Sequence, residues 1–303
     1  MKVDYIIQEA SSKHRLLIFD NHFMKMKDSA LVLVAVNDED EIIGRIIVEE
    51  KQVPLPLSGC CWFIVNLFIN NDCRRCGIAA ALVSTVKEKA KQKDILYLYG
   101  SANPTVEASF FWFSQGFSMT KYGQKQSDSS KPLRYGNYYH MFCYRIDRTG
   151  NHRKAEYPIV KANSQQLEMI FDRCMNAEGI SDAVKEYYHT NQDHFSALAA
   201  LSDTEEIVGF LQIIPDEMYA PFDSVQWWLR NIYVNPEYRR KGIGASLVNE
   251  AVKRAKQNGV VQLNHMKSDE SEALFWNQLG FDMLFWDVNK TNGHRSVTAM
   301  LRI

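Results

Sequence analysis

The sequence contains no apolar run that approaches the roughly 20 residues of a membrane-spanning helix. Its first residues, MKVDYIIQEASSKH, lack a basic segment followed by an apolar one, so no secretory signal is predicted. The formal net charge is −1, and no excess of Lys and Arg marks a surface for nucleic acid or anionic lipid. Six cysteines in 303 residues do not indicate a disulfide framework. These absences predict a cytoplasmic protein without nucleic-acid or membrane partners.

The sequence does contain enough apolar residues for two cores. Hydrophobic residues make up 46% and charged residues 23%, which is typical of soluble globular domains. A length of 303 residues is too great for one ordinary mixed domain and suits two domains of about 150 residues.

An internal repeat divides the chain into two copies. NLFINNDCRRCGIAAALV at 66–83 matches NIYVNPEYRRKGIGASLV at 231–248, and EIIG at 41–44 matches EIVG at 206–209, both 165 residues apart. FWFSQGF at 111–117 matches FWNQLGF at 275–281 at an offset of 164. Three ordered matches at nearly constant offset indicate a duplicated domain. We therefore predict a domain at 1–147, a polar linker at 148–154 and a second domain at 155–303.

Each copy shows the same predicted order of elements. An opening strand is followed by a helix, a hairpin, a strand that leads into the Arg-Arg turn, a helix, a strand, a short helix ending at Gly and a closing strand. Ser164 is the expected N-cap of the first helix in the second copy. In that copy the strands are predicted at 156–163, 195–201, 207–214, 227–235, 260–266 and 296–303, and the longer helices at 164–178 and 242–258.

The turn at 239–245, RRKGIGA, has the properties of an anion site. A helix N-terminus offers unpaired N–H groups and a partial positive charge. Glycines allow a tight turn and close approach of a ligand to the backbone. Neighbouring Arg and Lys add fixed positive charge, so a diphosphate is the expected guest. The turn matches neither GxxxxGK nor GxGxxG.

This segment resembles the acyl-CoA-binding motif of the GNAT superfamily of N-acetyltransferases. The resemblance covers nearly the whole chain, once per half, and is more specific at 231–248 than at 66–83. It implies an α/β class with a mixed α+β sheet in two tandem GNAT-like acyl-CoA N-acyltransferase domains. It also implies acetyl-CoA as co-substrate, with its pantetheine arm between two splayed strands and no metal.

The resemblance also assigns cofactor contacts residue by residue. In the second copy these are Tyr233, Val234, Arg239, Arg240, Lys241, Gly242, Ile243, Gly244, Ala245 and Trp276. In the first copy they are Ile69, Arg74, Arg75, Cys76, Gly77, Ile78 and Ala79. Cys76 replaces Lys241, so the first copy has one cation fewer, and it is interpreted either as a second cofactor site or as a structural relic.

The catalytic groups depart from the family pattern. Many members use a Tyr four residues before the helix-ending Gly as the acid that protonates the thiolate, but here those positions are Trp112 and Trp276. An indole N–H donates a hydrogen bond without ionising. The strand before the turn also lacks the Glu that often serves as base. His265, at the end of the next strand, is our candidate base because its ordinary pKa suits proton transfer; a structural strand-end histidine is the alternative.

Two further patterns have a functional and a structural interpretation. Cys73 and Cys76 have zinc-motif spacing, but the repeat aligns them with Tyr238 and Lys241, so the spacing is interpreted as coincidence. The acidic stretch IPDEMYAPFDS at 214–224 either attracts a cationic amine or is a solvated loop.

The sequence therefore predicts an acetyl-CoA-dependent N-acetyltransferase in which a small amine attacks the thioester directly and the second copy is the catalyst. A non-catalytic acyl-CoA sensor or scaffold is the alternative. A tandem transferase that builds a small thiol or peptide-like metabolite is a third hypothesis, and a homodimer is left open.

Overall fold

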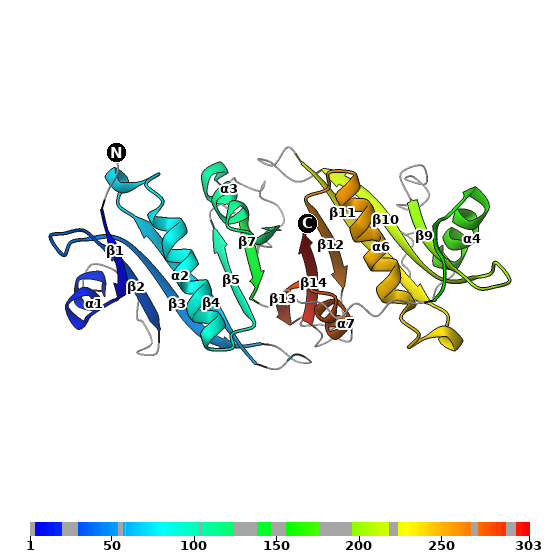
Figure 1. Ribbon diagram of the computed structural model, residues 1–303, viewed down its shortest axis with the longest axis horizontal. Helices are drawn as coiled ribbons and strands as arrows, with labels where there is room; N and C mark the ends of the chain where they lie inside the picture. Colours follow the sequence, from blue (N-terminus) through cyan, green and yellow to red (C-terminus); the bar gives the residue numbers. More distant parts are fainter. Residues whose placement is uncertain are drawn as a thin grey trace, which may run out of the picture. The chain divides into compact units, whose positions relative to one another are not determined.

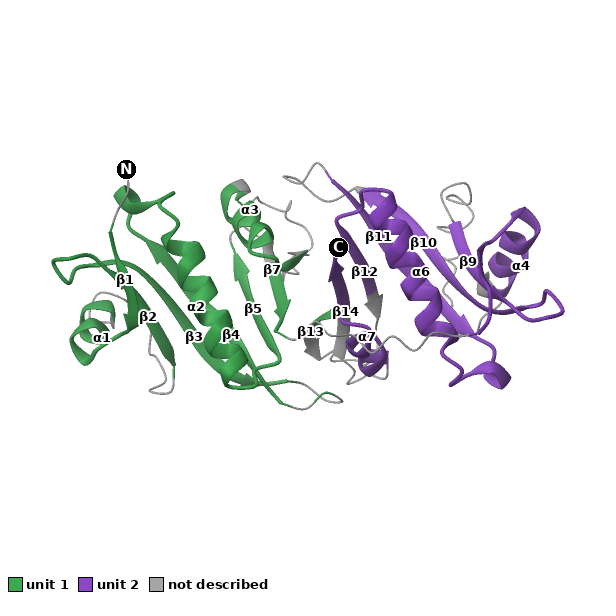
Figure 2. Cartoon of the chain, viewed as in Figure 1, with its two compact units in different colours: residues 1–148, 282–284 green, residues 149–281, 285–303 purple. Residues whose placement is uncertain are grey.

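The computed structural model describes most of the chain and divides it into two compact units. The described residues are 4–19, 30–53, 57, 59–102, 105–123, 138–146, 156–175, 196–217, 224–267, 272–288 and 295–303. One unit contains residues 1–148 with 282–284, and the other contains 149–281 and 285–303 (Figure 2). The predicted linker at 148–154 lies outside the described residues. Among the described helices, none has the length and apolarity needed to cross a bilayer.

The N-terminal unit contains a mixed sheet with the strand order β1-β2-β3-β4-β5-β7-β6 (Figure 1). The neighbours β4 and β5 are parallel, and the other pairs are antiparallel. Its elements are β1 (Ile6–Glu9), α1 (Ser12–Phe19), β2 (Leu31–Val36), β3 (Ile42–Gln52), β4 (Cys60–Ile69), the 3-10 helix η1 (Asn71–Cys73), α2 (Ile78–Gln92), β5 (Tyr97–Ala102), α3 (Val106–Ser114), β6 (Ser118–Gly123) and β7 (Tyr138–Arg145).

The second sheet has the order β13-β14-β12-β11-β10-β9-β8. Here β11 and β12 are the parallel pair. The elements are β8 (Ile159–Lys161), α4 (Ser164–Met175), β9 (Ser196–Leu201), β10 (Ile207–Glu217), β11 (Val225–Val234), the 3-10 helix η3 (Pro236–Tyr238), α6 (Ile243–Gln257), β12 (Gln262–Lys267), α7 (Ala273–Gln278), β13 (Asp282–Val288) and β14 (Arg295–Arg302). Two mixed seven-stranded sheets with helices confirm the predicted fold class, once per half of the chain.

Helix α6 lies across the face of the sheet formed by β9, β10 and β11 (Figure 1). Its apolar residues recur at helical spacing, and Ile243, Leu247, Val248, Ala251 and Ala255 are buried on one face. Basic residues in its last turn complement the negative end of the helix dipole. Burial of this face fixes the helix, and therefore its N-terminal turn, against the sheet.

The repeated EIVG segment has a packing role that the sequence pattern did not reveal. A Cβ atom on Gly209 would lie 2.9 Å from Ile243 Cγ2 and 3.0 Å from Tyr233 O. In the first copy, a Cβ on Gly44 would lie 2.8 Å from Ile69 Cδ1 and 3.0 Å from Ile78 Cγ2. Each glycine therefore lets the first residue of the helix approach the sheet closely.

We expect Gly209→Val to lower the free energy of unfolding by about 1–3 kcal/mol, because the added side chain overpacks the contact with Ile243. Chemical denaturation checks this, with Thr204→Val as the control because Thr204 is exposed in the same hairpin. An unchanged transition in Gly209→Val would contradict the close-approach argument.

The predicted N-cap of α4 is wrong by one residue. The helix begins at Ser164, and Asn163 caps it. Asn163 Oδ1 accepts from Gln166 N–H at 2.9 Å, and Gln166 Oε1 accepts from Asn163 N–H at 3.0 Å. This reciprocal capping box uses two main-chain donors at once, which the Ser164 assignment did not consider. In the first copy, the corresponding helix is described as Ser12–Phe19, and residues 20–29 lie outside the described residues.

Candidate functional site

The turn between β11 and α6 contains two residues with left-handed backbone. Asn235 begins it, and its Oδ1 accepts from Glu237 N–H at 3.3 Å. Arg240 has φ 65° and Gly242 has φ 81°. This conformation is uncommon for arginine but free of steric cost for glycine. Turns that combine such residues form main-chain concavities that bind anions.

The first turn of α6 adds main-chain donors to this concavity. Its first intrahelical bond runs from Ser246 N–H to Gly242 O at 3.0 Å. The N–H groups of Ile243, Gly244 and Ala245 therefore have no acceptor within the helix. They lie at the positive end of the helix dipole. A diphosphate fits this donor set.

Three exposed basic side chains, Arg239, Arg240 and Lys241, accompany these donors. Arg239 Nε donates to Val234 O at 3.1 Å, which ties the side chain to the end of β11. Lys241 Nζ lies 4.8 Å from the centroid of the Tyr238 ring. The predicted cofactor residues from 239 to 245 therefore lie together in one turn, which we call the cradle, and their contact with a cofactor stays a prediction.

The first copy has nearly the same cradle backbone. Arg75 has φ 62° and Gly77 has φ 82°, and the first bond of α2 runs from Ala81 N–H to Gly77 O at 3.0 Å. Arg74 Nε donates to Ile69 O at 3.4 Å, as Arg239 does to Val234 O. The remaining predicted residues of this copy, Cys76, Ile78 and Ala79, occupy the positions of Lys241, Ile243 and Gly244. The two cradles thus differ in side-chain charge more than in backbone.

The strand that leads into the cradle of the second copy parts from its neighbour. In the described part of the chain, β11 and β12 pair over 226–228 and 262–264 only, although β11 continues to Val234 and stays paired with β10. Asn231, with φ 43°, lies where the register with β10 shifts, as in a bulge. Tyr233 and Val234, predicted to contact the cofactor through the main chain, follow this bulge.

His265 lies just beyond the last β11–β12 pair, and the residue is only 5% exposed. Its Nδ1 lies 2.8 Å from Leu229 O, which can only accept, so Nδ1 carries the proton of this hydrogen bond. Its Nε2 lies 3.6 Å from Glu272 Oε2. The ring stacks on Trp276 with a centroid distance of 4.2 Å and an interplanar angle of 26°. The structure therefore brings the candidate catalytic residue against the predicted cofactor residue Trp276.

The first copy has a different aromatic pair at this point. The sheet register places Gly100 where the second copy has His265, and Phe142 where it has Ala299. Trp112 stacks on Phe142 with a centroid distance of 3.9 Å and an angle of 16°. A Cβ on Gly100 would lie 2.6 Å from Phe142 Cζ, so glycine makes room for the phenyl ring. The ring that covers the tryptophan is ionisable in the second copy and apolar in the first.

Other candidate groups have structural roles. Two further side chains are the β5 tyrosines Tyr97 and Tyr99, and burial raises the pKa of both phenols, which is typical of packed tyrosines rather than proton donors. Asp216 accepts from Trp228 Nε1 at 2.9 Å, whereas the side chains of Glu217 and Asp223 lie outside the described residues. No group of three or more potential metal-binding side chains occurs within the described ranges.

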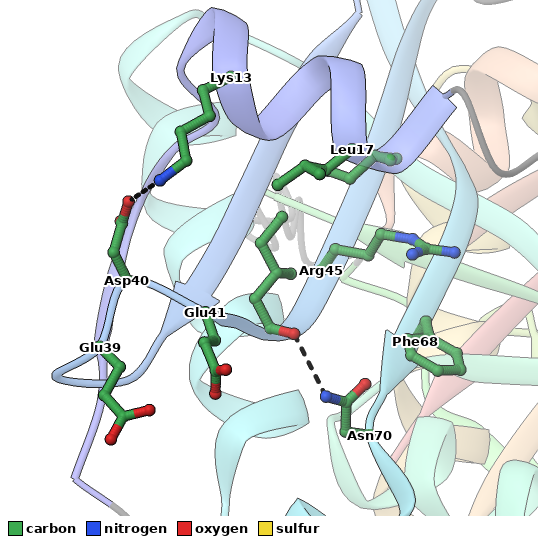
Figure 3. Close-up of a pocket in the computed structure, with 10 residues that line it drawn as sticks. Lys13, Leu17, Glu39, Asp40, Glu41, Arg45, Phe68 and Asn70 are labelled. Atoms are coloured by element: carbon green, nitrogen blue, oxygen red, sulfur yellow. Dashed lines mark hydrogen bonds and ion pairs between the residues drawn. The ribbon is translucent and has the colours of Figure 1, made fainter.

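A cavity of about 430 Å³ in the N-terminal unit was not predicted (Figure 3). It lies between α1, the β2–β3 hairpin and the end of β4, and both cations and acids line it. Arg45 Cζ stands 4.8 Å from the centroid of the Phe68 ring, and burial lowers the pKa of its guanidinium. Asn70 Nδ2 donates to Ile42 O at 3.3 Å at its edge. An arginine in the otherwise apolar run IIGRIIV was the available sequence signal.

Comparisons with known proteins identify a family for the chain. The model of the Acetyltransferase (GNAT) family matches residues 4–117 and 164–281. A search of curated proteins found no match. The structural matches include NAA60 of Arabidopsis thaliana in complex with a bisubstrate analogue, at 16% identity and a TM-score of 0.38, covering 48% of this chain and 99% of that one. They also include the GNAT family N-acetyltransferase YhbS of Escherichia coli in complex with CoA, at 18% identity and a TM-score of 0.38, covering 51% and 85%.

An aminoglycoside 6'-N-acetyltransferase complexed with coenzyme A matches at 18% identity and a TM-score of 0.39, covering 48% of this chain and 96% of its own. Identities this low carry no statement about substrate. The family model carries the assignment, because its two matched regions span most of the chain and fall one in each copy. The chain belongs to the GNAT acetyltransferase family and contains two GNAT domains in tandem.

Proposed function

We propose that the protein is an acetyl-CoA-dependent N-acetyltransferase whose C-terminal domain carries out the transfer. The observation that carries this proposal is the cradle at the start of α6, where the N–H groups of Ile243 to Ala245 have no acceptor within the helix and lie beside three exposed cations. This arrangement suits the diphosphate of coenzyme A. The bulged strand that leads into it supports an extended pantetheine arm beside Tyr233 and Val234.

We assign catalysis to the C-terminal domain because only there is the ring stacked on the repeated tryptophan, Trp276, able to transfer a proton. Both domains have a cradle, but in the second an ionisable ring covers the tryptophan, whereas in the first a phenyl ring does. A neutral amine attacks the thioester carbonyl directly, and main-chain N–H groups near Val234 stabilise the developing oxyanion. A small amine is the proposed acceptor, and acetyl-CoA is the proposed donor.

Turnover of the full-length protein with acetyl-CoA tests this proposal. We expect release of the CoA thiol that depends on the amine, measured over a panel of small primary amines, amino acids and amino sugars. Acceptance of amino-acid or amino-sugar conjugates would favour the synthesis of a small peptide-like metabolite. If acetyl-CoA binds but no amine of the panel is acetylated, the proposal of an enzyme is contradicted. The result would then favour the acyl-CoA sensor.

A binding role for the N-terminal domain is a second candidate function. Its cradle has nearly the same backbone, while its Trp112–Phe142 pair has no ionisable group. We therefore propose that this domain holds acyl-CoA without acetyl transfer. Calorimetry of the full chain would then give two CoA equivalents, and Arg74→Glu with Arg75→Glu would reduce them to one. A single equivalent in the unsubstituted protein would contradict this role.

A further inference from the structure

The stacked pair of His265 and Trp276 contains two buried nitrogens that have no hydrogen-bond partner among the described residues. Trp276 is 1% exposed and His265 is 5% exposed. Within the described part of the chain, neither Trp276 Nε1 nor His265 Nε2 has a hydrogen-bond partner. Buried polar atoms in native proteins are nearly always satisfied, so such an exception calls for an explanation such as a missing ligand. Glu272 Oε2 lies 3.6 Å from His265 Nε2, beyond hydrogen-bond length, so a ligand shared by the two adjacent rings would satisfy both nitrogens.

His265 and Trp276 lie on elements next to those that form the cradle. His265 is the first residue of β12 beyond its pairing with β11. Trp276 belongs to α7, and its neighbour Phe275 lies against the first turn of α6, since a Cβ on Gly244 would lie 3.3 Å from Phe275 Cε2. Phe275, the chain neighbour of Trp276, therefore packs against the turn that forms the cradle.

The hydrogen bonding of His265 indicates that its Nδ1 carries a proton. Nδ1–H donates to Leu229 O, so Nε2 is the nitrogen that gains or loses a proton. Glu272 Oε2 lies 3.6 Å from Nε2, and a carboxylate facing a nitrogen lone pair would be repulsive. A proton on Nε2 turns this contact into an ion pair, and the Trp276 face also favours a cation. The geometry therefore favours His265 as a proton donor, the reverse of the base expected from the sequence.

We propose that Trp276 Nε1–H and His265 Nε2–H bind the thioester sulfur, and that His265 protonates the thiolate as it leaves. This inference rests on the proposed function. As the amine nitrogen bonds to the carbonyl carbon, the carbon–sulfur bond breaks and its electron pair stays on sulfur, which takes the Nε2 proton. The surplus proton on the amide nitrogen passes to water. Glu272, whose side chain is 31% exposed, returns a proton from solvent to Nε2.

The first copy provides the matched control. Trp112 occupies the same position on α3, but it stacks on Phe142 and has Gly100 in place of the histidine. Substitution of Trp112 therefore removes an equivalent ring from a site without the second polar group. It tests for general effects of a lost indole.

The test compares CoA with desulfo-CoA, which lacks the thiol, as ligands of the full-length protein. Arg74→Glu with Arg75→Glu serves as the background, so that the C-terminal cradle dominates the heat of binding. We expect CoA to bind about 10-fold more tightly than desulfo-CoA, as one charge-assisted hydrogen bond allows. Trp276→Phe and His265→Gln should bring this ratio close to one with little change for desulfo-CoA, while Trp112→Phe should keep it.

Unchanged affinity for desulfo-CoA also shows that each variant retains its folded cradle. A ratio near one in the background protein, or a full ratio in both Trp276→Phe and His265→Gln, would overturn the sulfur contact while leaving the cradle intact. Absence of binding by either ligand would overturn the proposed function itself. The two failures are therefore distinguishable.

Discussion

Reversal of charge at Arg239 and Arg240, by Arg239→Glu with Arg240→Glu, is expected to weaken CoA binding at the C-terminal cradle by about 100-fold or more. Each charge-assisted hydrogen bond to a phosphate contributes about 1.5–3 kcal/mol, and two are removed. The new carboxylates also repel the diphosphate beside the N-terminus of α6. Acetyl transfer should fall by at least the same factor at limiting acetyl-CoA. Calorimetry and thiol release measure the two effects.

The control reverses the same number of charges at the other end of the helix. Lys253→Glu with Lys256→Glu changes two exposed side chains of α6 that lie far along the helix from its N-terminal turn. We expect near-normal CoA binding in this variant, since helix-end charges act within about one turn. Because Arg239 Nε also donates a hydrogen bond to Val234 O, circular dichroism should verify that the Arg239→Glu, Arg240→Glu variant is folded. Unaltered CoA affinity in a folded Arg239→Glu, Arg240→Glu protein would refute the cradle.

A large loss of acetyl-transfer rate is expected when the residues stacked around Trp276 are replaced by those found around Trp112 in the N-terminal domain. His265→Gly with Ala299→Phe reproduces the Gly100 and Phe142 arrangement at the same register positions. The rate of acetyl transfer should fall by about 100- to 10,000-fold, the usual contribution of a positioned acid or base. CoA binding through the cradle should persist. Rate measurements at saturating acetyl-CoA, together with calorimetry, separate the two quantities.

This conversion is designed to preserve packing, because the first copy shows that a phenyl ring over the tryptophan fills the space. His265→Gly alone is the matched comparison and should unfold more readily, since it leaves a cavity. The reverse change, Gly100→His with Phe142→Ala, should leave acetyl transfer by the whole protein unaltered. Normal turnover in the folded His265→Gly, Ala299→Phe protein would exclude His265 from the chemistry.

Much of the architecture could be predicted because it depends on residue patterns that are local in the sequence. The repeat, the buried stripe of α6 and the turn residues around Gly242 each follow from spacing along the chain. The Asn163 cap was misassigned by one residue, because two adjacent polar residues can both accept a helix N–H and only the reciprocal bond to Gln166 distinguishes them.

The candidate site was predicted unevenly for a similar reason. The cradle is a contiguous segment, so the sequence alone identified its residues. The partners of His265 lie on two other elements: Leu229 is on β11, Trp276 is on α7, and Glu272 is the N-cap residue of α7. No local pattern relates these positions. The exchange of Gly100 and Phe142 for His265 and Ala299 involves strands far apart in sequence that are adjacent only in the sheet.

By itself, the sequence determined that this protein is two copies of one domain, each with a basic, glycine-containing turn at a helix N-terminus. These properties depend on residue type and spacing, which a chain carries before it folds. Only the tertiary structure decided which ring lies on each tryptophan, which nitrogen of His265 donates to Leu229 O, and where, among the described residues, two buried ring nitrogens lack hydrogen-bond partners. Those properties depend on distances between strands and helices that side-chain packing sets.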